Sequence, residues 1–161
     1  MASDSAAGAA EGLVIREARK EDLTDVYDIE TLSFGSEAYE PFLLQLYFSL
    51  ARETFLVAEV EGRVIGYAIG VLTKWGGGHV ISIAVHPSFR RMGIAEKLLS
   101  ELLKRMRQRG AKAVRLEVKV GNEPAINLYK KLGFRTVGVI NNYYPNGEDA
   151  YVMMVDLDEN R

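Results

Sequence analysis

The stretch His79–Met106, HVISIAVHPSFRRMGIAEKLLSELLKRM, decides the fold of this chain. Its first part predicts a β-strand, because residues 80–85 form an apolar run rich in strand-forming residues. Pro87 lacks a backbone donor and biases His86 away from helix, so we expect the strand to end there. The last part carries an apolar residue at every fourth position, which predicts one face of an amphipathic helix. These residues are Ile94, Leu98, Leu102 and Met106.

The turn between this strand and this helix, residues 90–95, combines positive charge with small side chains. The first turn of a helix has unpartnered N–H groups and a partial positive charge. Gly93 and Ala95 would let an anion approach that backbone closely, and Arg90 and Arg91 add full charges. Two interpretations follow from the residues alone. The turn is a cradle for a pyrophosphate, or it is an ordinary strand-to-helix connection with surface arginines.

Composition narrows the class of protein. A chain of 161 residues, 48% hydrophobic and 26% charged, predicts one globular domain with a substantial core. The net charge of −2 argues against a general nucleic-acid-binding surface, and the lack of cysteine excludes disulfides, a thiolate nucleophile and a cysteine metal cluster. With two histidines, a histidine-rich metal site is not expected. No apolar run approaches the roughly 20 residues needed to span a membrane.

The N-terminal residues 1–12, MASDSAAGAAEG, predict a disordered tail rather than a secretory signal, because they contain no basic region and no long apolar core. We therefore expect a cytoplasmic protein. The rest of the chain alternates short strands and helices in the order β, α, α, β, β, β, α, β, α, β, β. Besides the central strand, the expected strands are residues 13–18, 54–60, 63–72, 113–118, 134–139 and 150–157. Hairpins mixed with helical crossovers predict an α/β fold with a mixed sheet.

Two motifs in this order resemble one family. Arg90–Ala95, Arg-x-x-Gly-x-Ala after a strand, resembles the acetyl-CoA-binding motif of the GNAT N-acetyltransferases. Asn122–Phe134 is similar to that family's second signature, Asn-x-x-Ala-x-x-Leu-Tyr followed by Gly-Phe. The resemblance implies a single GNAT-like domain over residues 13–161, with a mixed, mostly antiparallel sheet flanked by helices. It also implies acetyl-CoA as co-substrate and no metal.

A narrower resemblance concerns the acceptor. Gly78–Val85, Tyr143–Tyr151 and Glu37–Tyr39 look like segments of protein N-terminal acetyltransferases, namely the archaeal enzymes and the catalytic subunit of the eukaryotic N-alpha-acetyltransferase A complex. Three positions depart from the pattern, with Arg90 in place of Gln, Ala38 in place of Asn and Ser36 in place of Pro. The implied partners are protein or peptide N-termini, including nascent chains at the ribosome. No membrane or specific nucleic-acid partner is implied, and an auxiliary subunit is left open.

The family motifs assign a cofactor-binding set. Backbone N–H groups of the turn would hold the pyrophosphate, and the end of the central strand would present its backbone to the pantetheine arm. Asn122 would bond the same arm, and from its own sequence context it is a helix N-cap. The full set is Ile83, Ala84, Val85, Arg90, Arg91, Met92, Gly93, Ile94, Ala95, Asn122 and Tyr129.

The resemblance also assigns catalytic roles. Tyr129 would be the general acid for the departing thiolate, and the alternative is a core tyrosine. Glu117 and His79 would share the role of base through a water; the alternatives are a solvated strand face for Glu117 and a buried, hydrogen-bonded His79.

Four further residues, Glu37, Tyr39, Tyr143 and Tyr144, would contact the peptide, or else pack at the surface. The predicted function is N-alpha-acetyl transfer by direct attack in a ternary complex. Two alternatives remain open: a lysine or small-amine acetyltransferase of the same fold, and a non-catalytic CoA-binding module.

Overall fold

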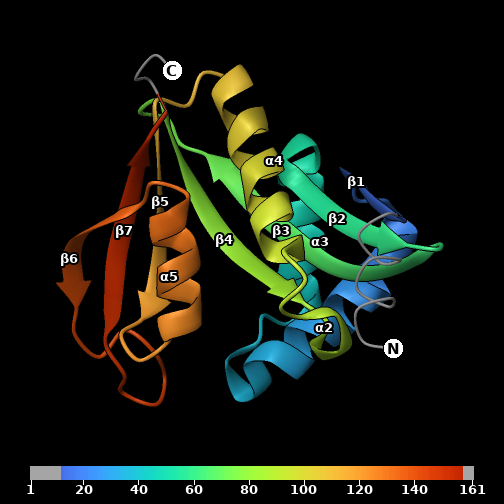
Figure 1. Ribbon diagram of the computed structural model, residues 1–161, viewed down its shortest axis with the longest axis horizontal. Coiled ribbons are helices and arrows are strands. Elements are labelled where there is room, and N and C mark those ends of the chain that lie inside the picture. The colour runs from blue at the N-terminus through green and yellow to red at the C-terminus, as the bar shows by residue number, and fades with distance from the viewer. Residues whose placement is uncertain (1–11, 158–161) are drawn as a thin grey trace.

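A seven-stranded sheet forms the centre of the molecule in the computed structural model, which describes residues 12–157 (Figure 1). The strand order is β1-β2-β3-β4-β5-β7-β6, and every neighbouring pair is antiparallel except β4 and β5. The strands are β1 (Leu13–Glu17), β2 (Phe55–Val60), β3 (Arg63–Leu72), β4 (Gly77–Val85), β5 (Ala113–Lys119), β6 (Arg135–Ile140) and β7 (Ala150–Asp156). The predicted mixed, mostly antiparallel sheet is confirmed.

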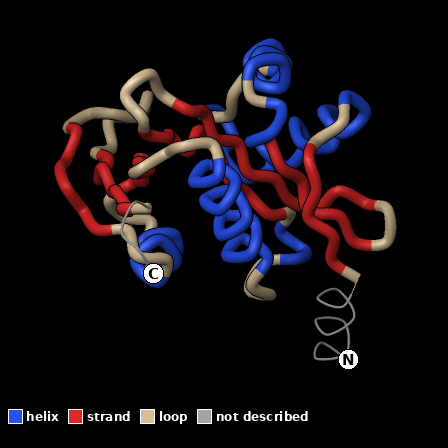
Figure 2. Tube along the Cα trace, turned by 90° about the horizontal axis from the view of Figure 1, so that it is seen from above, coloured by secondary structure: helices blue, strands red, loops and turns tan. Residues whose placement is uncertain are grey.

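Helices cover both faces of this sheet (Figures 1 and 2). The α-helices are α2 (Leu23–Phe34), α3 (Pro41–Leu50), α4 (Ile94–Gln108) and α5 (Glu123–Lys131), and the short 3-10 turns are η1 (Lys20–Asp22), η2 (Gly35–Glu37), η3 (Arg52–Thr54) and η4 (Pro87–Phe89). One hydrophobic cluster joins α4 and α5 to the sheet, and a second joins α2 and α3 to its other face. The sheet therefore separates two cores.

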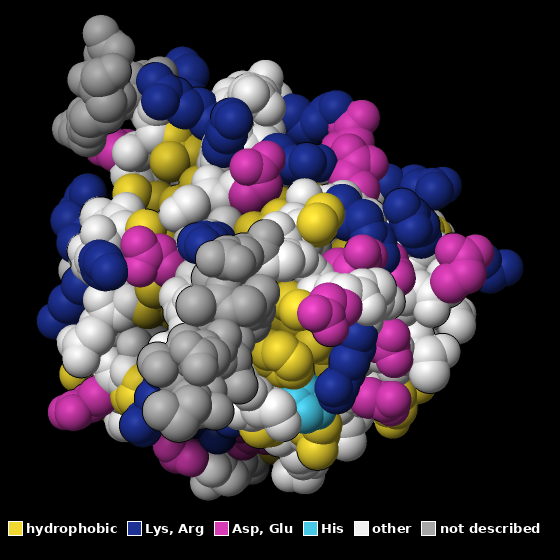
Figure 3. Space-filling model, turned by 45° about the vertical axis from the view of Figure 1, so that its right-hand side comes forward, with side chains coloured by type: hydrophobic (Ala, Val, Ile, Leu, Met, Phe, Trp, Pro, Cys, Tyr) yellow, Lys and Arg dark blue, Asp and Glu magenta, His cyan; other side chains and the backbone are white. Residues whose placement is uncertain are grey.

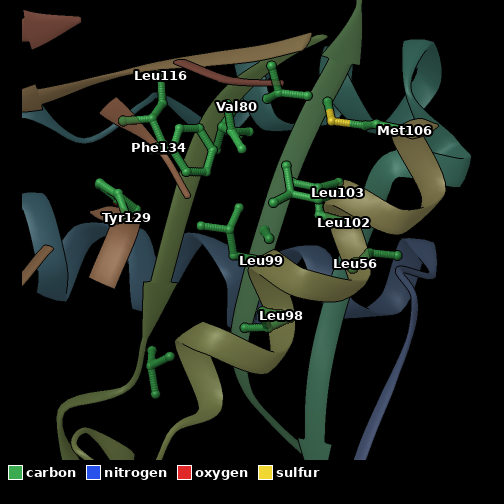
Figure 4. Packing of buried hydrophobic residues seen from close by; sticks show 14 of the residues in the cluster. Leu56, Val80, Leu98, Leu99, Leu102, Leu103, Met106, Leu116, Tyr129 and Phe134 are labelled. Atoms are coloured by element: carbon green, nitrogen blue, oxygen red, sulfur yellow. The ribbon is translucent and has the colours of Figure 1, made fainter. Parts of the chain in front are cut away.

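The predicted apolar stripe of α4 is confirmed. Leu98, Leu102 and Met106 are completely buried, and the helix packs along the sheet through them (Figure 4). Gly93 precedes the helix in a left-handed conformation, with φ of 78°. That backbone geometry favours glycine, and it sends the chain from the end of β4 back along the sheet.

The parallel pair β4–β5 is very short. Its register covers only Gly77 to His79 opposite Ala113 to Arg115, and the two strands separate beyond that point. A bulge lies just past the separation, because Ile69 of β3 pairs with Ser82 while the next residue of β3 pairs with Val80. Bulges re-aim side chains and interrupt pairing. The sheet is thus split at its centre, and the split is edged by residues of β4 and β5.

The start of β4 differs from the expectation. Gly77 and Gly78 precede the apolar run 80–85 that predicts this strand and look locally like a flexible link, but they are the first residues of the strand. A Cβ on Gly78 would lie 3.0 Å from the Met106 methyl group and 3.1 Å from Val114, so a larger residue here would force these side chains to shift. The predicted tail, residues 1–12, lies outside the described residues except for Gly12.

Candidate active site

A cavity of about 420 Å³ occupies the split between β4 and β5. It is lined from both faces of the sheet, by residues of α2 and the loop after it on one side and by residues of α5 on the other. Nine of the predicted site residues line it together: Glu37, Tyr39, His79, Ile83, Glu117, Asn122, Tyr129, Tyr143 and Tyr144. Residues from five separate parts of the chain therefore meet at one place.

His79 and Glu117 face each other across the split. His79 Nε2 lies 2.6 Å from Glu117 Oε1, and only 11% of the Glu117 side chain is exposed, so a solvated strand face is excluded. Burial alone would raise the pKa of Glu117, but its hydrogen bond to His79, helped by Arg115 and the Tyr143 hydroxyl, leaves that pKa below its ordinary value. The carboxylate is therefore ionised at neutral pH. Its contribution to folding stability is lost only as the pH falls through the lowered pKa.

Tyr129 lies on the opposite side of the cavity, on α5. It is 8% exposed, and its ring packs against Phe134 with 5.9 Å between ring centroids (Figure 4). Burial raises the pKa of Tyr129 to about 12, so the phenol keeps its proton at neutral pH. The side chain belongs to the core and also lines the cavity, so the two interpretations from the sequence are compatible.

The rim of the cavity on the α2 side carries a cluster of charged and aromatic groups. Lys119 Nζ lies 2.6 Å from Glu37 Oε1 and 3.5 Å from Glu148 Oε1, and it stands 5.1 Å above the ring of Tyr144. The hydrogen bond that Lys119 donates to Glu37 is the main cause of a raised pKa for Lys119. This lysine therefore joins the loop between α2 and α3 to the loop between β6 and β7.

Tyrosines complete this rim. Tyr143 and Tyr144 meet edge to face with 4.9 Å between ring centroids, and Tyr39 meets Tyr47 of α3 in the same way at 6.1 Å. Burial raises the pKa of Tyr39 to about 12. Apolar ring surface with a few hydroxyl groups suits contact with a peptide of variable sequence.

The turn 90–95 follows the end of β4 and does not line the cavity. Ala84 and Val85, the last two residues of β4, do not line it either. The Arg90 side chain is held in place, because its Nε donates to the Val85 carbonyl at 3.0 Å and a terminal nitrogen donates to Ser33 Oγ at 3.1 Å. Arg90 thus braces the turn against α2. The backbone N–H groups at the start of α4 are the part of this turn that suits an anion.

Asn122 is an N-cap, as predicted. Its Oδ1 accepts a hydrogen bond from the backbone N–H of Ala125 at 3.3 Å, and Pro124 occupies the first turn of α5. The same side chain lines the cavity. Capping therefore places a polar group at the mouth of the split.

Three functional candidates were missed at the level of sequence: Glu30, Ser82 and Lys119, all of which line the cavity. A signal existed for Glu30, since a glutamate stands on the apolar face of α2 beside Val26 and Ile29, and all three are buried. No local pattern marks Ser82 or Lys119, because Ser82 meets Glu30 from 52 positions away in the chain and Lys119 meets Glu37 from a different strand region altogether.

The remaining surface offers less. A second hollow, of about 530 Å³, is lined mostly by charged side chains of α4 and their neighbours, and several of these form ion pairs with one another. Figure 3 shows positive and negative side chains intermingled over one face. Among residues 12–157, no group of three or more potential ligands is placed to hold a metal ion, and no helix is long and apolar enough to cross a membrane.

The geometry defines an α/β protein with a cavity, lined by both polar and apolar side chains, in a split sheet, and with a glycine-containing turn that suits an anion. Residues 21–134 match the model of the Acetyltransferase (GNAT) family. An N-alpha-acetyltransferase of Sulfurisphaera tokodaii is 41% identical over 156 residues, which cover 89% of this chain and 92% of the relative. An N-alpha-acetyltransferase of Caenorhabditis elegans is 33% identical over 149 residues, which cover 89% and 82%.

The solved structures agree with these relatives. Ard1 from Thermoplasma volcanium is 32% identical and matches with a TM-score of 0.86, covering 92% of this chain and 99% of that chain. This chain belongs to the GNAT acetyltransferase family, a family that uses acetyl-CoA. The resemblance seen in the two sequence motifs is confirmed.

Proposed function

We propose that the protein transfers an acetyl group directly from acetyl-CoA to the N-terminal amine of another protein, and that this reaction takes place in the cavity. The two substrates would enter from opposite faces of the sheet. The activity predicted from the sequence, N-alpha-acetyl transfer, is confirmed by near full-length relatives of that name. The observation that supports the proposed route is the cavity in the β4–β5 split, which brings Tyr129 and the His79–Glu117 pair together.

On the α5 side, residues of this chain would hold the acetyl-CoA. The backbone of the 90–95 turn would bind the pyrophosphate, and the backbone of residues 83–85 would bind the pantetheine arm, with Asn122 beside it. Tyr129 would donate a hydrogen bond to the departing sulfur. A thiol has a pKa of about 8.5, so the leaving group needs only modest help, and a phenol that keeps its proton can give it.

On the α2 side, the free N-terminus would enter between Glu37, Tyr39, Tyr143 and Tyr144. His79 and Glu117 would take a proton from the amine through a water. An α-amino group has a pKa of about 7.7–8.0, so much of it is already neutral near pH 7.5 and the base has little to do. We place the reaction in the cytoplasm, where nascent chains present their N-termini.

Peptides test this proposal directly. We expect acetylation of peptides beginning Ser, Ala, Met-Leu or Met-Glu, and none of matched lysine-containing peptides with blocked N-termini, measured by mass spectrometry. Acetylation of the blocked peptides would instead favour a lysine acceptor, whose pKa of about 10.4 would make the rate rise beyond pH 9. Binding of CoA without any transfer would favour the non-catalytic alternative.

Replacing Glu117 by glutamine should lower kcat about tenfold, which is less than the roughly 100-fold at the low end of what acid–base groups supply. The variant keeps the size of the side chain but removes the charge that faces His79. Glu117 is already ionised well below neutral pH, so the rise of kcat/KM with pH should report the acceptor amine. Its midpoint should lie near the pKa of about 7.7–8.0 of that amine, with a plateau about one unit higher, and should stay the same in the variant. Glu59→Gln is the matched control, since Glu59 pairs with Arg16 away from the cavity. An unchanged kcat in Glu117→Gln would contradict the assignment.

A further inference from the structure

Glu30 is a buried carboxylate for which the proposed chemistry has no role. It lies on the inward face of α2 and is 1% exposed. Its Oε1 accepts hydrogen bonds from the Tyr67 hydroxyl and, at 2.8 Å, from Ser82 Oγ, while its Oε2 accepts from the backbone N–H of Tyr39 at 2.9 Å. The carboxylate thus connects α2 with β3, with β4 and with the loop that leads into α3.

All three donors to this carboxylate are neutral. No lysine, arginine or histidine within residues 12–157 forms an ion pair with Glu30. A buried charge without a cationic partner is costly, and a well-packed apolar side chain often serves stability as well or better. A role other than packing is therefore the better explanation of the glutamate.

The bulge in β4 makes this contact possible. Side chains normally alternate between the faces of a strand, but Ile81 and Ser82 both lie on the α2 side of β4, where Ile81 packs against the second cluster and Ser82 reaches Glu30. The interruption that accompanies the split of the sheet therefore also supplies a donor to the buried carboxylate.

The third donor belongs to the acceptor loop, which we define as residues 35–40. This loop carries Glu37 and Tyr39, both on the rim where the peptide would enter. The Tyr39 N–H is its tie to Glu30, and the Glu37 carboxylate is its tie to Lys119. Glu30 therefore holds the loop from inside the protein, while Lys119 holds it at the rim.

We propose that Glu30 is a positioning residue that fixes the acceptor loop against β3 and β4, and so sets the affinity for the peptide rather than for acetyl-CoA. This assignment rests on the proposed acceptor site. The length of the side chain is what matters, because the carboxylate must reach the Tyr39 N–H and the two hydroxyl groups at once. The negative charge is secondary, since every partner is a neutral donor.

Two substitutions separate length from charge. Glutamine keeps the length of the side chain. Its oxygen can accept from the Tyr39 N–H, and its NH₂ group can donate to the Tyr67 and Ser82 hydroxyl groups once these rotate to act as acceptors. Aspartate keeps the charge but is one methylene shorter. We expect Glu30→Asp to raise the KM for a peptide about tenfold, as for loss of a hydrogen bond to a charged group, and Glu30→Gln to raise it by less than about threefold.

The KM for acetyl-CoA and the CoA dissociation constant should change by less than about twofold in both variants. Thr54→Val is the control for a general loss of stability, because Thr54 Oγ1 makes a buried 2.6 Å hydrogen bond to the Gly70 carbonyl outside the cavity. This control should lower the melting temperature without changing the ratio of the two KM values.

The opposite order, with Glu30→Gln worse than Glu30→Asp, would overturn the proposal in favour of a direct role for the charge. An equal rise of both KM values, or no change of either in Glu30→Asp, would leave Glu30 a structural residue only. If the wild-type protein acetylated no peptide, the proposed function itself would fail, and that result is distinct from each of these.

Discussion

Replacing Ala95 by glutamate is expected to weaken CoA binding at least about 100-fold while the protein stays folded. Ala95 is half-buried in the first turn of α4, next to the backbone N–H groups that would receive the pyrophosphate. Two like charges about 4 Å apart repel by about 4 kcal/mol near a protein surface, which is more than the roughly 3 kcal/mol of a 100-fold effect. The longer side chain would also occupy the space that the anion needs.

The fold should tolerate this change. An acidic residue in the first turn of a helix interacts favourably with the helix dipole, and α4 already has Glu96 there. Ser100→Glu is the matched control, because it adds the same charge at an exposed position further along α4. Calorimetric titration with CoA measures the difference. If the Ala95→Glu variant bound CoA as tightly as the wild type does, the turn 90–95 would not be part of the CoA-binding site.

Replacing Tyr129 by phenylalanine is expected to lower kcat about 100-fold, at the low end of the usual range for a general acid. The size of the effect is limited because a thiolate is already a fair leaving group. The ring should keep its packing against Phe134, so the melting temperature and the affinity for CoA should stay close to those of the wild type. The loss should therefore fall on kcat and not on binding.

Steady-state kinetics with a saturating peptide test this expectation. Tyr27→Phe is the control, because Tyr27 is a half-buried tyrosine of α2 that lies outside the cavity. A fall in kcat of less than about threefold for Tyr129→Phe would show that the hydroxyl has no catalytic role. The tyrosine would then be a core residue alone.

The order of the elements could be predicted because each one carries its own local signal. The repeat in α4, the Pro87 break and the Asn122 cap are all readable over a few residues, and the structure confirms them. The start of β4 could not be predicted in this way. Gly77 and Gly78 look locally like a flexible link, and they form a strand because of distant partners: β3 and β5 pair with them, and Met106 packs against Gly78.

The candidate site could likewise be predicted only where local sequence carries a signal. The family motifs pointed to Tyr129 and Asn122, and both line the cavity. Burial alternates along β5, so that Glu117 points away from its buried neighbours Leu116 and Val118. Glu117 and His79 lie 38 positions apart in the chain, and their contact depends on the parallel pairing of β4 with β5. Lys119 lies still further from Glu37 in the chain, so neither partner could be inferred from local spacing.

The short pairing of β4 with β5 has a practical consequence for turnover. In the proposed arrangement, acetyl-CoA and the acceptor peptide enter from opposite sides of the sheet, and they meet only where β4 and β5 separate. A bulky acceptor, such as a chain still attached to a ribosome, would not obstruct the exchange of spent CoA for fresh acetyl-CoA. Exchange of the cofactor can therefore proceed while the acceptor polypeptide stays bound.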